Sequence, residues 1–270
     1  MKRAKRRPLS VKEMNRKIKI EDSVRTAERH EIIELYSSQG ITPSATFEDF
    51  KCPYKSSCLG TKDKDTWKSG NWAYVGFQYG RAQINGRFVK LFVIAMDRGG
   101  YEGSNEQMFE ETQFDFRDAT ETRGNAHMAG VSLILEYLLD EKDKYSIQYS
   151  LTNAVKCATK SGNMNAVRQK QVISNCSAHL EREISILKPD IIITQGDHPK
   201  QTIRRIFPVN EKEMHFGVVS LWKNEGKIIL ATPHPARLKG MAYRRGKMPK
   251  YFYEAIDEVK QFFWGGGWRK

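Results

Sequence analysis

Polar residues that could do chemistry stand at the ends of the four most apolar runs of the chain. In chain order they are Asp97, Asn153, the segment Gly196-Asp197-His198, and His234. A carboxylate, an amide and an imidazole can activate water, hold a polar ligand by hydrogen bonds and donate a proton. Because ligands of open α/β sheets bind beyond the carboxyl ends of the strands, we expect these residues to share one site.

Each of these residues also has a structural interpretation. Asp97 could cap a helix or a turn, Asn153 could satisfy nearby backbone groups, and His234, between two prolines, could be an ordinary loop residue. A shared site is favoured because all four apolar runs end in polar or glycine residues.

Four cysteines form the second set of reactive side chains. Cys52 and Cys58 lie close together in CPYKSSC, whereas Cys157 and Cys176 come much later in the chain. The N-terminus MKRAKRRPLS lacks the apolar segment of a signal peptide, so we expect an intracellular protein, in which disulfides are rare. Two pairs of thiols brought together by folding could bind a metal ion or a cluster. The spacing alone also allows four unrelated thiols.

Four apolar runs, separated by helical patterns, would position these residues. The runs cover residues 89–97, 146–155, 190–197 and 227–235. Helical periodicity appears over residues 131–139, in the stripe Ile173, Cys176, Leu180, Ile184 and Leu187, and in a terminal helix with Phe252, Ile256, Val259 and Phe263 on one face. This alternation predicts a three-layer α/β/α sandwich with a central four-stranded parallel sheet.

The composition suits a globular domain that binds a polyanion. The chain has 270 residues, of which 39% are apolar, and a formal net charge of +13. Such a charge most often serves nucleic acid, with a membrane surface as the rival partner. No run of 18 or more apolar residues occurs, so we expect no membrane span.

The N-terminal part of the chain differs from the rest in charge. Residues 2–19 hold nine Lys or Arg, which predicts a solvated basic arm that either meets phosphates or only aids solubility. A helical patch with Ile32 and Tyr36 follows, and Gly40 comes after its end. We therefore divide the chain into a basic arm and helix at residues 1–45 and a globular domain at residues 46–270. Nothing in the sequence indicates an obligate dimer, and we expect a monomer.

Three motifs in order resemble those of the uracil-DNA glycosylase superfamily, especially its iron-sulfur branch, family 4. They are LTNAVKC, then Cys176 followed by a helix and KPDIIITQG, and finally ATPHPARL. The resemblance spans roughly residues 50 to 260 and implies the uracil-DNA glycosylase-like fold for residues 46–270. CPYKSSC fits the family's N-terminal cysteine pair, although its spacing is wider than the usual two-residue gap. The resemblance implies a structural 4Fe-4S cluster on Cys52, Cys58, Cys157 and Cys176.

The resemblance also assigns roles at the strand ends. Asn153 matches the Asn that reads the base, His234 matches the donor His, and Asp97 is placed for the catalytic carboxylate. Asn153 would then face the base pocket, while Cys157 turns away toward the cluster. After the His, the family has a loop that wedges into the duplex, and ARLKGMAYRRGKMPK occupies that position. Its expected DNA contacts are Arg237, Leu238, Lys239, Arg244 and Arg245.

Two motifs depart from the family pattern. Family 4 opens its first motif as Gly-Glu-Ala-Pro-Gly, whereas this chain has AMDRGGYEG, so Glu102 is the reserve for Asp97 as the carboxylate. The stacking aromatic of a Pro-Phe-Val-Gly segment has no clear counterpart in ETRGNAHMAG, where Asn125 and His127 stand instead. Asp197 and His198 add polar groups where the family has small apolar residues. All four are candidate base contacts and imply a wider, more polar pocket.

These residues predict a monofunctional DNA glycosylase that flips a nucleotide and hydrolyses its N-glycosidic bond, leaving an abasic site. The two departures favour a modified pyrimidine, such as hydroxymethylated or glucosylated cytosine of phage DNA, and hence a role in antiviral defence. Excision of uracil in base excision repair is the alternative. A non-catalytic DNA-binding module with an iron-sulfur cluster or zinc is a further alternative, and the retained Asn153 and His234 argue against it. We expect the protein in the cytoplasm, associated with the nucleoid.

Overall fold

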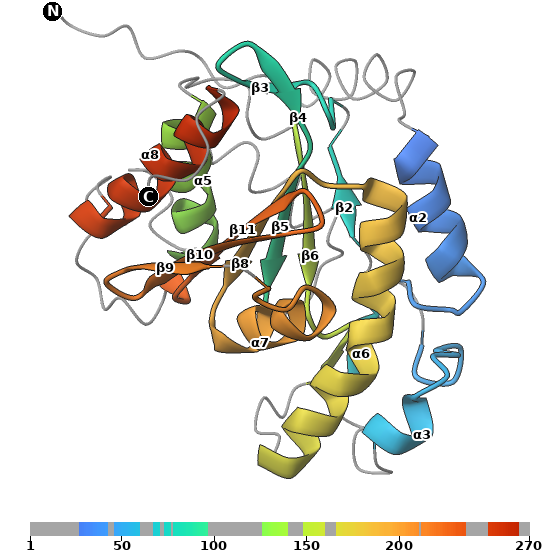
Figure 1. The fold of residues 1–270 in the computed structure, drawn as a ribbon. Coiled ribbons are helices and arrows are strands. Elements are labelled where there is room, and N and C mark those ends of the chain that lie inside the picture. Colours follow the sequence, from blue (N-terminus) through green and yellow to red (C-terminus); the bar gives the residue numbers. More distant parts are fainter. Residues whose placement is uncertain are drawn as a thin grey trace, which may run out of the picture.

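A central sheet with helices on both sides forms the core of the protein (Figure 1). The computed structural model describes residues 27–42, 46–59, 67–70, 73–76, 78–96, 126–139, 148–159, 166–210, 212–235 and 248–264. The rest of the chain lies outside the described residues.

Four parallel strands form the middle of the central sheet. In spatial order they are β6 (Tyr149–Asn153), β5 (Leu91–Ala95), β8 (Ile191–Gln195) and β11 (Lys227–Thr232). Apart from Lys227 their residues are buried, as expected for strands that are covered on both faces. The prediction of a four-stranded parallel sheet is confirmed, and each strand lies within the apolar run that predicted it.

Antiparallel strands, which the sequence pattern did not predict, extend this core to a seven-stranded sheet. β2 (Tyr74–Val75) pairs with β6, β10 (Val219–Asn224) pairs with β11, and β9 (Glu213–Phe216) pairs with β10. Two separate ladders join β1 (Trp67–Gly70) to β7 (Cys157–Thr159) and β3 (Ala82–Ile84) to β4 (Arg87–Val89). β9 was missed because its side chains are only partly buried or exposed, so it lacks an apolar pattern.

The helices cover both faces of the sheet, which confirms the three-layer architecture (Figure 1). On one side lie α5 (Ala126–Leu139) and α8 (Lys250–Phe263), and on the other lie α2 (Ala27–Ser37), α3 (Lys55–Cys58), α6 (Ala166–Leu187) and α7 (Asp197–Ile206). Each side buries its own apolar cluster. Leu91 and Val93 of β5 belong to the first cluster, and Phe92 and Ile94 belong to the second. We name the two sides of the sheet the α5 face and the α6 face.

Helix α6 follows the apolar stripe that the sequence predicts. The five residues of the stripe are buried, and four of them, Cys176, Leu180, Ile184 and Leu187, pack in the α6-face cluster. The helix ends at Leu187 because Pro189 disfavours the helical conformation of Lys188, which takes a φ of 46°. Only residues 188–190 connect α6 to β8, so the connection between these two elements is short.

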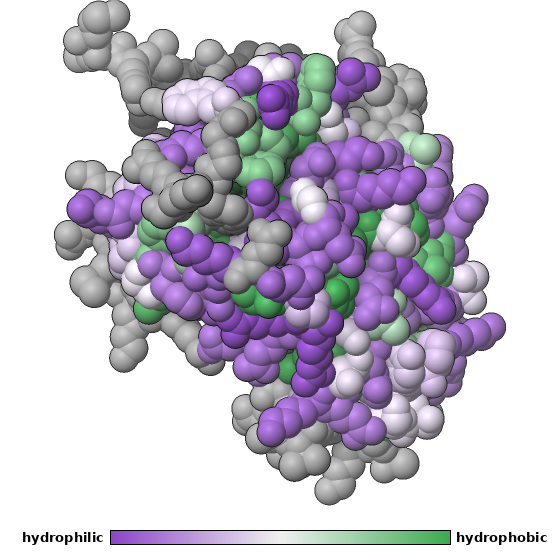
Figure 2. Space-filling model, viewed as in Figure 1, coloured by the Kyte–Doolittle hydropathy of each residue, from purple (hydrophilic) through white to green (hydrophobic). Residues whose placement is uncertain are grey.

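Helix α2 packs against α6 in the described structure (Figure 1). Residues 1–26, which include the predicted basic arm, lie outside the described residues, and the division of the chain at residue 45 stays a prediction. The side of the molecule seen in Figure 2 is mainly hydrophilic, with small apolar areas between the polar side chains. None of the helices described is both long enough and apolar enough to cross a membrane.

Candidate functional site

Four parallel strands end side by side at the carboxyl edge of the central sheet. The register aligns Asn153 with Ala95 and Gln195 with Thr232. The pairing of Ile94 with Thr194 puts Ala95 level with Gln195. We name the four aligned strand ends, Asn153, Ala95, Gln195 and Thr232, the edge row. It lies where open α/β sheets bind their ligands.

The edge row lies on the α5 face. Side chains alternate along a strand, so each member shares its face with the residue two positions earlier. Those earlier residues all belong to the α5-face cluster: Leu151, Val93, Ile193 and Leu230. Ala95 therefore places only a methyl group between the amides of Asn153 and Gln195, whose Cα atoms are about 10 Å apart across two strand spacings.

Asn153 is buried, with 6% of its surface exposed, at the end of β6. The backbone beyond it is satisfied without its side chain, because the Ala154 amide donates to the Ala95 carbonyl and the Val155 amide to the Met96 carbonyl. Within the part of the chain that the structure describes, no hydrogen bond occupies the Asn153 amide. This amide can therefore offer an acceptor and two donors to a ligand.

Gln195 is a polar member of the edge row that sequence reasoning missed. Its side chain is fully buried, and among the described residues neither its amide oxygen nor its amide nitrogen has a hydrogen-bond partner. In the sequence, Gln195 stands near the end of the apolar run at residues 190–197 and is not marked by a motif of its own. Alternation from Ile191 and Ile193 would have placed it on one face of the sheet, but only the register shows that Asn153 shares that face.

His234 lies against Gly196 beyond the ends of β11 and β8. The Gly196 amide donates to the Thr232 carbonyl at 2.8 Å, and a Cβ on Gly196 would lie 3.4 Å from the Cβ of His234. Gly196 has a φ of 108°, a conformation that favours glycine. Asp197 and His198 follow directly as the first residues of α7, the former exposed and the latter partly buried. The segments that carry these three predicted residues are thus brought together.

Asn153 and His234 come from strands at opposite ends of the edge row, with β5 and β8 between them. The Cα atoms of Asn153 and Thr232 are about 14 Å apart over three strand spacings. A ligand that contacts both Asn153 and His234 must therefore extend across two strands. An amide at one end and an imidazole at the other suit a ligand with a polar ring and a bond to be broken next to it.

Several predicted site residues lie outside the described residues. They are the carboxylates Asp97 and Glu102, the candidate base contact Asn125, and the loop residues Arg237, Leu238, Lys239, Arg244 and Arg245. His127 belongs to the first turn of α5, the helix that covers the α5 face. The described part of this segment ends at Met96, which follows Ala95 of the edge row and precedes Asp97.

The four cysteines lie on the α6 face, away from the edge row. Cys58, Cys157 and Cys176 are buried in the α6-face cluster, and Cys52 packs against it. None of these four cysteines forms a disulfide bond. Asn175 donates to the Cys58 sulfur at 3.1 Å, and the Cys52 sulfur lies 3.5 Å from Nε2 of His179. Cys157 therefore lies on the α6 face, opposite the face of the edge row.

The thiols are close enough to influence one another electrostatically. Burial raises the pKa of Cys176 to about 12, and the nearby thiols of Cys58 and Cys52 add to this rise, whereas Lys156 opposes it. Burial also raises the pKa of Cys52, with a further contribution from Cys58. The described residues contain no set of three or more side chains arranged to hold a metal ion. Three buried thiols and one partly buried thiol beside them nevertheless supply the donor number and type that an iron-sulfur cluster requires.

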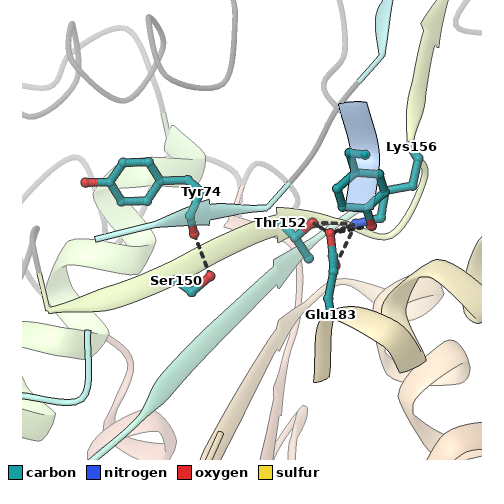
Figure 3. Close-up of polar contacts among 6 residues, drawn as sticks. Tyr74, Ser150, Thr152, Lys156 and Glu183 are labelled. Atoms are coloured by element: carbon teal, nitrogen blue, oxygen red, sulfur yellow. Dashed lines mark hydrogen bonds and ion pairs between the residues drawn. The ribbon is translucent and has the colours of Figure 1, made fainter. Parts of the chain in front are cut away.

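A buried polar network that includes Thr152, the chain neighbour of Asn153, lies on the α6 face (Figure 3). The ammonium of Lys156 contacts both carboxylate oxygens of Glu183 at 2.8 Å, and both side chains are essentially inaccessible to solvent. The hydroxyl groups of Tyr36 and Thr152 also donate to Glu183, at 2.7 and 3.1 Å. Burial lowers the pKa of Lys156, and the paired carboxylate counteracts that effect. The network ties α2, β6 and α6 together.

Comparisons with known proteins identify a family. The family model described as the Uracil DNA glycosylase superfamily matches residues 87–260, which is more than half of the chain. The type-4 uracil-DNA glycosylase of Sulfurisphaera tokodaii is 28% identical to this chain over 186 residues, which make up 67% of this chain and 72% of that relative.

Proposed function

The chain belongs to the uracil-DNA glycosylase superfamily, close to its type-4 branch, and we propose that it excises a base bound at the edge row. As a DNA glycosylase it is a hydrolase that acts on DNA. The observation that supports this location is the register of the parallel strands, which aligns Asn153 with Gln195 and brings Gly196 against His234.

Asn153 reads the base in this proposal. A base inside duplex DNA cannot reach a buried side chain, so the nucleotide is flipped into the pocket and held by its Watson–Crick edge. The Asn153 side chain is buried, and no hydrogen bond occupies its amide among the described residues. A base can therefore bind this amide without displacing another hydrogen-bond partner. Asn125, His127, Asp197 and His198 are further candidate base contacts.

His234 and a carboxylate act on the glycosidic bond. Hydrolysis breaks the bond between C1′ of the sugar and the base nitrogen, adds the hydroxyl of water to C1′ and leaves the electron pair on the base. His234 stabilises the departing base by donating a hydrogen bond to its oxygen, and Asp97 favours the cationic sugar and orients the water, with Glu102 as the reserve. The product is an abasic site.

The loop after His234 contacts the DNA. Arg237, Lys239, Arg244 and Arg245 neutralise phosphates, and Leu238 enters the gap that the flipped nucleotide leaves. The formal charge of +13 supports DNA as the partner. A monomer at the nucleoid in the cytoplasm remains part of the proposal.

We extend the proposal to a 4Fe-4S cluster on Cys52, Cys58, Cys157 and Cys176. When bound, the cluster supplies a covalent cross-link between four chain segments and takes no part in hydrolysis. The gathering of Cys58, Cys157 and Cys176 in the α6-face cluster, with Cys52 packed against it and no disulfide among them, supports this ligand set. Anaerobically purified protein should contain about four iron atoms per chain and absorb near 400 nm, whereas zinc without iron would contradict the cluster.

The proposed substrate is a modified pyrimidine, such as hydroxymethylated or glucosylated cytosine of phage DNA, in antiviral defence. Its support is the altered first motif and the polar residues Asn125 and His127 at the position of the stacking aromatic. Uracil is the second candidate, and the family of the relative named above favours it.

Abasic-site formation on defined DNA tests the proposed function. Oligonucleotides with uracil, 5-hydroxymethylcytosine or glucosylated 5-hydroxymethylcytosine at one position are incubated with the protein, and abasic sites are cleaved with alkali. Faster release of a modified base than of uracil is the expected result. Release of uracil alone would contradict the modified-base substrate, and release of no base would support a non-catalytic binding module.

A further inference from the structure

Gln195 is buried at the carboxyl end of the central strand β8, and in the part of the chain that the structure describes neither atom of its amide has a hydrogen-bond partner. A buried amide that leaves its water partners behind costs about 1–3 kcal/mol for each unsatisfied group. Leu, Ile or Met would fill the same volume in the sheet without this cost. The retained amide therefore requires an explanation beyond folding.

The position of Gln195 connects it to the base-reading Asn153. Both residues lie in the edge row on the α5 face, with Ala95 of β5 between them. Across about 10 Å, two amides with a methyl group between them can approach one planar ring from two sides. Helix α5, which carries the predicted base contact His127, covers the same face.

The hydrogen-bonding capacity of the two amides exceeds what a bare pyrimidine edge needs. One Asn amide can pair with the ring N3 position and the neighbouring exocyclic group. The acceptor and two donors of Gln195 remain for a group outside that edge. A hydroxyl on a substituent of the ring is both donor and acceptor, and it can pair with a glutamine amide in either orientation of that amide.

We propose that Gln195 is a specificity-determining residue that hydrogen-bonds a hydroxyl-bearing substituent of the flipped pyrimidine, opposite Asn153. This inference rests on the proposed function. It names the pocket residue that distinguishes a hydroxymethylated base from a bare one. Such a contact discriminates strongly between substrates, because a substrate without the hydroxyl leaves the buried amide of Gln195 unpaired.

Thr194 provides a matched control in the same strand. Its hydroxyl is also fully buried and unpartnered, but its side chain points to the α6 face, since Ile193 and Gln195 flank it on the α5 face. T194V removes an unpartnered polar group next to Gln195 without touching the edge row.

Single-turnover rates of base release test the inference. Wild-type protein, Q195M and T194V are each given uracil, 5-hydroxymethyluracil and 5-hydroxymethylcytosine in single-stranded and duplex oligonucleotides. For Q195M, we expect the rates on the two hydroxymethylated bases to fall about tenfold or more relative to the rate on uracil. T194V should keep the wild-type ratio. Thermal unfolding of Q195M should occur at the wild-type temperature or above, because an unsatisfied amide has been removed.

Three outcomes would overturn the inference. They are an unchanged rate ratio in Q195M, an equal fall on all bases, or a clearly lower unfolding temperature, which would show that the amide has a structural partner such as a buried water. A second measurement needs no variant: free 5-hydroxymethyluracil should inhibit the wild-type protein more strongly than free uracil, and equal inhibition would contradict the inference. Wild-type protein that releases no base contradicts the proposed function itself, whereas activity with an unchanged ratio contradicts only the role of Gln195.

Discussion

Two sets of buried polar side chains at the carboxyl edge of the central sheet, one on each face, differ in their hydrogen-bond partners. On the α6 face, Lys156 and Glu183 form an ion pair whose carboxylate also accepts hydrogen bonds from Tyr36 and Thr152. On the α5 face, the amide of Gln195 is buried at the same edge of the sheet and has no hydrogen-bond partner within the described ranges. Asn153, next to Thr152 in the chain, has an amide that no hydrogen bond occupies among the described residues.

This difference separates groups that serve the fold from groups that await a ligand. A buried charge is tolerated when its partners restore the interactions that water supplied, and the network on the α6 face does this within the chain. An unpaired buried amide weakens the fold, and it becomes useful only when a ligand provides the missing partner. We therefore expect the network of Lys156 and Glu183 to contribute stability, and the amides of Asn153 and Gln195 to serve recognition as proposed above.

Breaking the ion pair should have the largest effect on stability. Glu183→Leu leaves Lys156 buried without a counter-charge and should lower the free energy of unfolding by about 3–5 kcal/mol. The double variant K156M/E183L removes both charges and should recover most of this loss. Urea unfolding followed by circular dichroism measures both. If the double variant were as unstable as E183L, the cost would come from lost packing and not from an unpaired charge.

The architecture could largely be predicted from the sequence. Strands β5, β6, β8 and β11 are continuous apolar runs, and α6 carries a regular stripe, so burial and periodicity define them. The edge strand β9 could not be predicted in this way, because its residues are only partly buried. β2 has only two residues, which is too short for any alternation to appear.

The site was predicted where a motif marked it and missed where only the register marks it. Asn153 and His234 stand in motifs that resemble a family. Gln195 stands in an ordinary strand, and its alignment with Asn153 depends on hydrogen bonds between β6, β5 and β8. Lys156 and Glu183 are 27 residues apart, and only the packing of α6 on β6 pairs them. Sequence patterns of period 2 or 3.6 contain no information about such long-range contacts.

Replacing Asn153 should separate activity from stability. N153L should slow base release about a hundredfold, equal to about 2.7 kcal/mol in the transition state, because the base loses its hydrogen-bonding partner. Its free energy of unfolding should change by less than about 1 kcal/mol, since no hydrogen bond among the described residues is lost. Single-turnover kinetics and urea unfolding check the two expectations.

Asn224 is the control for this substitution. It is equally buried, at 6% exposed, but its amide donates to the Pro208 carbonyl at 2.5 Å. N224L should therefore cost about 1–2 kcal/mol of stability and leave the rate of base release unchanged. A variant N153L that unfolds as readily as N224L would argue that Asn153 is a structural residue.

Because of Tyr36, the free energy of unfolding should depend on pH in the alkaline range. Burial, followed by the nearby Glu183 carboxylate, raises the pKa of Tyr36 well above its usual value of about 10. The folded protein thus keeps a proton that the unfolded chain releases, so the stability is complete below about pH 10 and is lost as the pH rises further. Y36F should cost about 1.5–3 kcal/mol at neutral pH, because a hydrogen bond to a charged group is lost.

The same variant should lose stability less steeply above pH 10. One titrating tyrosine accounts for about 1.4 kcal/mol per pH unit, and Y36F removes that contribution. Tyr79, whose pKa burial also raises, keeps its own contribution, so the slope falls but does not vanish. Equal slopes for Y36F and the wild-type protein in urea unfolding at several pH values would show that Tyr36 does not titrate in this way.

Thr152 and Thr194, one on each side of Ile94 in the sheet, give the smallest and most closely matched difference in stability. Thr152 and Thr194 are both buried, and both are aligned with Ile94, but only Thr152 bonds to Glu183 and receives a bond from Lys156. The hydroxyl of Thr194 has no hydrogen-bond partner among the residues that the structure describes. T152V should lower the free energy of unfolding by about 1 kcal/mol, and T194V should leave it unchanged or raise it slightly, because valine keeps the shape and removes only the hydroxyl. Urea unfolding of both variants measures the difference, and equal losses would mean that the hydrogen bonds of the network add nothing beyond packing.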